Sequence, residues 1–179
     1  MSTSNPADSW YSLVPPHNGD LRQGDFFFGC PVALPRCYSS QAEAVADIDK
    51  IDIVVMSQSC DLEHTKVEFA VVCPVKSLSR LMELYPDTFN QKSVRDALQK
   101  DMQPGYCLLD GIDILPSQRQ GPLVVDFHRT LCVHVQQLRD EALALDARVR
   151  LTPPYRERLS QAFAKYYMRV ALPAPISGL

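Results

Sequence analysis

Two apolar runs that lie close together in the chain constrain its fold more than any other feature. Residues 51–56 and 67–75 are almost continuously apolar and rich in β-branched side chains, which is typical of strands covered on both faces. A polar segment, residues 57–66, separates them. We therefore expect two buried strands joined by a short connection. Pro74 is expected at the end of the second strand, because proline cannot donate a hydrogen bond to a ladder.

The polar connection, SQSCDLEHTK, holds the first candidate site. Nucleophilic catalysis by Cys60 would need a lowered thiol pKa and an imidazole within hydrogen-bond reach. Asp61 follows Cys60 directly, and its negative charge disfavours the thiolate. The candidate bases are His64, His128 and His134. Sequence alone does not bring the last two of these to the thiol.

Cys60 and His64 are also candidate metal ligands, since they offer a thiolate and an imidazole close together, with carboxylates at Asp61 and Glu63. Structural zinc takes four ligands, and the chain has no CxxC pair to complete a familiar spacing. We therefore expect no cofactor, with zinc as the alternative. The competing interpretation is a surface turn in which Ser59 and Asp61 bond local backbone amides.

The length of 179 residues suits one domain, and 46% hydrophobic residues suffice for a core. A formal charge of -3 gives no general attraction to nucleic acid or anionic membrane, so RNA binding would need a local basic face. No apolar run approaches the roughly 20 residues that cross a bilayer. The first residues lack the basic start and apolar core of a secretory signal. We expect a cytoplasmic protein without a membrane partner.

A cytoplasmic location also predicts the redox state of the cysteines. Six cysteines could form three disulfides in a secreted protein, but in the cytoplasm they stay reduced. Cys73, Cys107 and Cys132 lie in apolar runs, and we expect them to be buried packing residues.

The chain divides into an arm and a body. Residues 1–20 are rich in Ser, Pro and Asn and are expected to form a flexible N-terminal arm, with docking of Trp10, Tyr11, Leu13 and Val14 on the body as the alternative. Residues 21–179 are expected to form a single α+β domain, with an aromatic strand at 26–32 and a loop at 33–50. Further strands are expected at two places, 106–115 and 122–135, and a helix at 136–145.

Two helical regions complete the body. Residues 77–103 predict a helical insertion, a pair of helices, with Ser77 as the first N-cap. Residues 152–171 predict an amphipathic C-terminal helix with Thr152 as its N-cap and a proline in its first turn. Its apolar stripe follows helical spacing: Tyr155, Leu159, Ala162, Phe163, Tyr166 and Val170.

Three short motifs resemble the PemK/MazF-like toxin family. Gly24-Asp25-Phe26-Phe27 is similar to the start of the family's first strand, Ile53-Val54-Val55-Met56-Ser57 to its second, and Val71-Val72-Cys73-Pro74-Val75-Lys76-Ser77 to its third. The resemblance covers residues 22–77. The resemblance implies an SH3-like β-barrel, sequence-specific endoribonuclease activity, dimerisation and an antitoxin partner. Residues 50–75 also resemble uncharacterised small bacterial proteins with a Ser-Gln-x-Cys-Asp-Leu hairpin.

The chain departs from this family at its catalytic positions. The place of the family's catalytic arginine reads Asp49-Lys50-Ile51-Asp52 and has no arginine. The place of its catalytic threonine falls at Ser77, beside Lys76. The family has neither the Cys60-Asp61-Leu62 connection nor the helical insertion.

The sequence therefore predicts a small, bent antiparallel sheet or SH3-like β-barrel that carries an inserted helical pair and a C-terminal amphipathic helix. Because the catalytic arginine is absent, we rank an interaction subunit of a bacterial toxin–antitoxin or phage-defence system first, with a protein partner or a second copy of the chain in a homodimer. RNA binding or cleavage comes second, with Lys76 and Arg129 as RNA-binding residues and Cys60, Asp61 and Ser77 as catalytic ones. A thiol or zinc site at Cys60 and His64 is third.

Overall fold

The computed structural model describes residues 9–35, 46–115 and 120–168 and has a mixed α+β architecture. Its strands are β1 (Tyr11–Val14), β2 (Phe26–Pro35), β3 (Ala46–Val55), β4 (Phe69–Ser77), β5 (Tyr106–Leu109), β6 (Leu123–Asp126), β7 (Leu131–His134) and β8 (Arg148–Leu151). Its helices are α1 (Ser59–Glu63), α2 (Leu78–Leu84), α3 (Pro86–Phe89), α4 (Lys92–Gln99), α5 (Val135–Ala144) and α6 (Tyr155–Tyr167), with a 3-10 helix η3 (Phe127–Arg129).

The expected central strand pair is confirmed. β3 and β4 run antiparallel, with Ile53 opposite Pro74 and Val55 opposite Val72. Successive residues of these strands join different hydrophobic clusters, so the sheet is covered on both faces. Leu159 of α6 belongs to one cluster and Leu138 of α5 to the other. The sheet order is β2-β3-β4-β6-β5, and β7 also pairs with β4.

The expectation that Pro74 ends its strand is wrong. β4 continues to Ser77, and Pro74 lies where the strand changes its neighbour on one edge. Phe69 to Val72 pair with β7, and Val75 to Ser77 pair with β6, while η3 joins these two partners. A proline fits there because the missing N–H falls at the break between the two ladders.

For its described part, the arm expected over residues 1–20 is not flexible, and the alternative of docking on the body is confirmed. Tyr11–Val14 form β1, which pairs antiparallel with β8. The Tyr11 hydroxyl donates to the Asp110 carbonyl at 2.6 Å, and its ring is buried. Residues 1–8 lie outside the described residues.

Gly24 and Asp25 connect this small sheet to the central one. The Gly24 amide donates to the Val55 carbonyl at 2.8 Å, and the Leu151 amide donates to the Gly24 carbonyl at 2.9 Å. Gly24 adopts a φ of 85°, a conformation that favours glycine. With this φ, one tight turn forms hydrogen bonds to β3 on one side and to β8 on the other.

Asp25 is fully buried between two arginines of β8. Arg148 Nε lies 3.1 Å from Asp25 Oδ2, Arg150 Nη2 donates to the same oxygen at 3.0 Å, and Arg150 Nε bonds Oδ1. Burial lowers the pKa of Arg148, and the Asp25 charge opposes that effect. Pairing of this kind is what makes buried charges tolerable.

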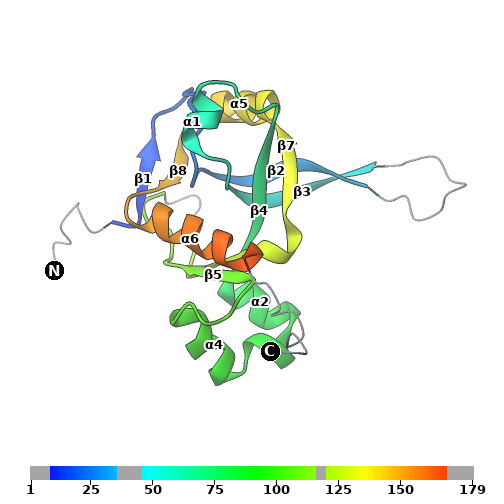
Figure 1. Ribbon diagram of the computed structural model, residues 1–179, viewed down its shortest axis with the longest axis vertical. Helices are drawn as coiled ribbons and strands as arrows, with labels where there is room; N and C mark the ends of the chain where they lie inside the picture. The colour runs from blue at the N-terminus through cyan, green and yellow to red at the C-terminus, as the bar shows by residue number, and fades with distance from the viewer. Residues whose placement is uncertain (1–8, 36–45, 116–119, 169–179) are drawn as a thin grey trace, which may run out of the picture.

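The helical insertion is confirmed, but it holds three helices rather than the expected pair. It forms three short helices, α2, α3 and α4, below β5 in Figure 1. Ser77 caps α2, because its hydroxyl accepts from the Arg80 amide at 3.2 Å. α2 ends at Leu84, and Pro86 starts α3.

The C-terminal helix and its apolar stripe are confirmed as far as Tyr167; Val170 lies outside the described residues. Its predicted cap is wrong: Pro154 occupies the N-cap position, and the Thr152 hydroxyl donates instead to the Ser9 carbonyl at 2.5 Å. None of the described helices is long and apolar enough to span a membrane.

The loop expected at 33–50 is wrong for its described ends. Residues 33–35 and 46–50 extend β2 and β3 into a two-stranded ribbon that projects from the body (Figure 1). Among the cysteines, burial of Cys73 and Cys107 is confirmed, but Cys132 is exposed on β7. Within the described residues no pairing closes the sheet into a barrel, so the α+β class alone is established.

Candidate functional site

The predicted site residues fall into two groups at opposite ends of β4. Cys60, Asp61 and His64 lie on or next to α1, before the strand begins. Lys76 and Ser77 lie where it ends, beside α2. Figure 1 shows α1 and α2 at opposite ends of the molecule. The catalytic set Cys60, Asp61 and Ser77 is therefore not brought together.

The residues around Cys60 stabilise the fold. The Ser57 hydroxyl accepts from the Val71 amide at 2.8 Å, and the Ser59 hydroxyl accepts from the Gln23 amide at 3.1 Å. Leu62 is buried in one of the core clusters. Ser59 thus bonds a backbone amide, as the surface-turn interpretation expects, but a remote one rather than a local one.

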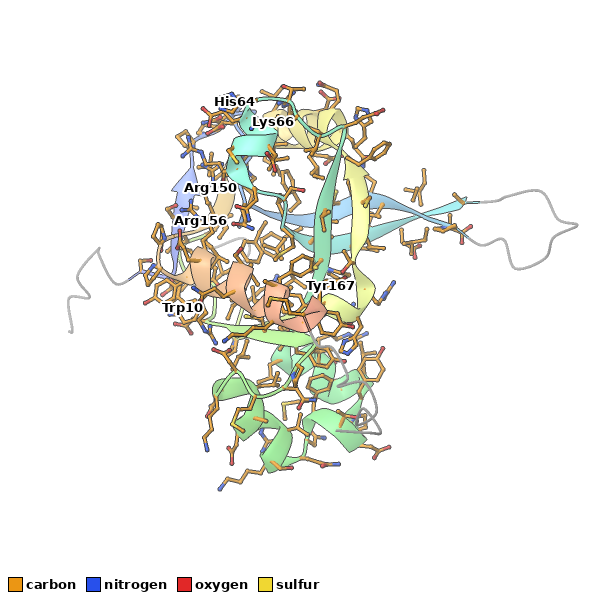
Figure 2. The ribbon with its side chains drawn as sticks, in the orientation of Figure 1. Trp10, His64, Lys66, Arg150, Arg156 and Tyr167 are labelled. Carbon is orange, nitrogen blue, oxygen red and sulfur yellow. The ribbon has the colours of Figure 1, made fainter. Side chains whose placement is uncertain are left out.

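The remaining side chains of this segment are largely exposed. Cys60 is exposed, with its Sγ 3.7 Å from Asp61 Oδ1. Lys66 Nζ lies 3.8 Å from the same carboxylate oxygen, and Figure 2 shows His64 and Lys66 at the outer end of the molecule. Within the described ranges, no three His, Cys, Asp or Glu side chains come together to hold a metal ion. Zinc binding stays a prediction.

The other end of β4 holds a cavity of about 460 Å³, here named the cationic cavity. Four basic side chains line it against two acidic ones, which leaves a local excess of two positive charges. They come from β3, β4, α2 and η3: Lys50, Lys76, Arg80 and Arg129, with Asp49 and Asp52. The predicted RNA-binding pair, Lys76 and Arg129, is thus brought together with Ser77.

The charges of this cavity differ in how they are paired. Arg80 Nη1 lies 2.8 Å from Glu83 Oε2, and Asp52 Oδ1 accepts from the Gly29 amide at 2.8 Å. Lys76 and Arg129 form no ion pair with any residue that the structure describes. Lys50 likewise forms no ion pair with a described residue, so these three cations are available to an anionic ligand.

A second pocket, here named the aromatic pocket, adjoins the cationic cavity and measures about 150 Å³. Lys76 and Arg129 line both. Its walls are mostly apolar and aromatic and come from β4, β5, β6, α2, α3 and the residues next to them: Pro74, Leu81, Tyr85, Thr88, Phe89, Tyr106, Val124 and Asp126. Burial and the nearby Asp126 carboxylate raise the pKa of Tyr106, which keeps the phenol neutral.

Asp126 and His128 form a bonded pair at the rim. The His128 amide donates to Asp126 Oδ1 at 3.0 Å, and His128 Nδ1 lies 2.9 Å from the same oxygen. The imidazole packs between Tyr106 and Tyr166 at centroid distances of 4.9 and 5.3 Å. It also covers Gly105, where a Cβ would lie 2.1 Å from the ring. His128 lies in η3, which divides the strand expected over residues 122–135 into β6 and β7.

Sequence reasoning misses the aromatic pocket. Sequence patterns assign Tyr85, Phe89 and Tyr106 to helices and a strand, and nothing in their spacing joins them to Asp126. The one available signal is the group of aromatic residues around Pro86 that follows a basic strand end at Lys76.

Comparison of the chain with protein-family models, with curated proteins and with solved structures finds no match. The resemblance to PemK/MazF-like toxins stays a prediction from its three motifs.

Proposed function

We propose that this protein binds single-stranded RNA across the cationic cavity and the aromatic pocket. The observation that carries the proposal is that Lys76 and Arg129 line both. A strand lying there could set its phosphates against unpaired cations while an adjacent base entered the aromatic walls. Proteins that bind single strands combine these two features, a basic groove and aromatic stacking surfaces.

The phosphate contribution follows from the local charge. The whole chain carries -3, so attraction for a polyanion depends on a local excess of positive charge such as this one. Lys50 and Arg80 extend the cationic surface beyond the shared pair. Asp49 and Asp52 weaken it, which favours a short contact of a few phosphates.

A single strand suits the aromatic pocket better than a duplex does. Tyr85 has 55% of its surface exposed and reaches the pocket from the end of α2. Bases of a duplex are stacked on each other and cannot present their faces to such a ring.

Binding is supported more directly than cleavage. The Ser77 hydroxyl already caps α2, and it lies 3.1 Å from the Ser79 hydroxyl. Cys60 and Asp61 lie beyond the far end of β4. We further propose that the sheet is a distorted SH3-like barrel, because β4 is shared by three partner strands and Gly24 bonds both sheets.

Fluorescence anisotropy with a labelled mixed-sequence oligoribonucleotide tests the binding proposal. Lys76→Ala and Arg129→Ala should each weaken binding, roughly fivefold or more at low salt. Lys66→Ala removes the same charge at the far end of the molecule and should leave binding unchanged. Equal affinities for all three variants, or no binding by the unmodified protein, would contradict the proposal. The same RNA analysed on a gel reports any cleavage.

A second candidate function, an interaction subunit, is favoured by the ribbon of β2 and β3. Ile48 has 73% of its surface exposed on this projection, and an exposed apolar residue on a projecting strand suits contact with a protein partner, including a second copy of this chain. Light scattering of the purified protein measures its mass in solution. A dimer that Ile48→Lys converts to a monomer would support this candidate, and a monomer at all concentrations would remove the homodimer.

A further inference from the structure

We propose that the aromatic pocket holds one cytosine base of the bound strand and selects it over uracil. This inference rests on the proposed RNA binding and adds the base that the site accepts. Three observations carry it: the size of the pocket, the free oxygen of Asp126 and the two cations at the rim.

The pocket has room for one six-membered ring. A cavity of about 150 Å³ is the size that accommodates a benzene molecule in an apolar protein interior. Leu81, Phe89 and Val124 form buried apolar walls. Tyr85 and Tyr106 supply two more aromatic rings. A pyrimidine fits this volume, and a two-ring purine would project from it.

Asp126 decides which pyrimidine is favoured. Its Oδ1 is committed to His128, from whose amide it accepts at 3.0 Å. Its Oδ2 has no hydrogen bond with a described residue, so one carboxylate oxygen can accept from a ligand. The exocyclic amine of cytosine is a donor that carboxylates recognise. Uracil carries a carbonyl oxygen at that position, and a carboxylate repels it.

The carbonyl oxygen of the base meets donors. Lys76 and Arg129 line the pocket as well as the cationic cavity. Either side chain can donate to the carbonyl oxygen at position 2 of the pyrimidine while remaining close to the neighbouring phosphate. The acceptor on Asp126 and the donors on Lys76 and Arg129 thus match the amine and the carbonyl oxygen of cytosine's Watson–Crick edge.

The helical insertion supplies much of this pocket. Leu81 lies on α2, Tyr85 follows it, and Phe89 ends α3. The segment 77–103 therefore encloses the base, while the carboxylate that selects it comes from β6.

The test compares oligocytidylate with oligouridylate of equal length, each fluorescently labelled, by anisotropy at one salt concentration. The unmodified protein should bind oligocytidylate roughly tenfold more tightly, the discrimination expected of one well-formed base contact. Asp126→Asn should reduce this ratio to near one, because an amide can either accept from the cytosine amine or donate to the uracil carbonyl.

Asp49→Asn is the matched control, because Asp49 lines the cationic cavity and not the aromatic pocket. It should strengthen binding of both oligomers alike and keep their ratio. Circular dichroism establishes that each variant is folded. Equal binding of the two oligomers, or preference for oligouridylate, by the unmodified protein overturns the cytosine pocket while RNA binding stands. Failure to bind either oligomer overturns the proposed function itself.

Discussion

Lys76 at the end of β4 and Arg129 in η3 lie along the same two cavities although they are far apart in the sequence. β6 pairs with the end of β4, and η3 follows β6 directly, so the fold brings Arg129 back to Lys76. Neither cation forms an ion pair with a described residue. The proposed RNA site consists of this pair and the aromatic rings beside it.

The buried carboxylate of Asp25 is predicted to be essential for stability. Asp25→Ala would leave Arg148 without its charge partner in the interior, which should lower the free energy of unfolding by about 3–5 kcal/mol. Urea denaturation measures the change. Glu83→Ala removes a carboxylate that pairs with Arg80 on the surface and should cost less than about 1 kcal/mol. Equal losses for the two variants would contradict the structural role of Asp25.

Two glycines with positive φ differ in the space around them, so their alanine variants separate backbone strain from steric overlap. Gly29 has a φ of 66° with open space around it, whereas Gly105 has a φ of 92° and contacts His128. Gly29→Ala should cost about 1–2 kcal/mol of stability from the backbone alone. Gly105→Ala should cost more, because its Cβ would also displace the imidazole. A thermal or urea denaturation series that ranks them in the reverse order would contradict this packing.

The buried thiols are predicted to be unreactive in the folded protein. Burial raises the pKa values of Cys30, Cys73 and Cys107 from 9.0 to about 12. At about pH 8 these groups therefore stay protonated, and only thiolates alkylate. Iodoacetamide should modify Cys60 and Cys132 first, with the buried three reacting only after denaturation. Peptide mass spectrometry reads each site, and early modification of Cys107 would contradict the buried arrangement.

The elements that sequence predicts well are those with long apolar patterns. β3, β4 and α6 each carry a continuous run or stripe, and β3 and β4 are neighbours along the chain. The pairing of such segments can be predicted from their own residues, without knowledge of distant parts of the chain.

The elements that sequence misses depend on distant partners. β1 and β8 have four residues each, and Tyr11 pairs with Leu151 from the other end of the chain. Arg148 alternates with apolar neighbours but is charged, so its burial could not be expected without Asp25 beside it. The same holds for the candidate site, whose aromatic walls come from separate segments.

Cys60 is predicted to have no part in RNA binding. Its thiol is exposed on α1 and faces α6, at the other end of β4 from the cationic cavity. Cys60→Ala should leave both the affinity for RNA and the free energy of unfolding nearly unchanged, the latter within about 0.5 kcal/mol. Anisotropy and urea denaturation measure the two quantities. A marked decrease in affinity would contradict this prediction and show that the Cys60 segment is part of the binding surface.

The salt dependence of RNA affinity tests the central claim most directly. Removing one cation that contacts a phosphate should reduce the slope of log K against log salt by about 0.7 for a single strand. The double variant Lys76→Ala, Arg129→Ala should therefore show a slope shallower by about 1.4 than the unmodified protein, and Lys66→Ala should show none of this change. An unchanged slope in the double variant would contradict an RNA site at Lys76 and Arg129.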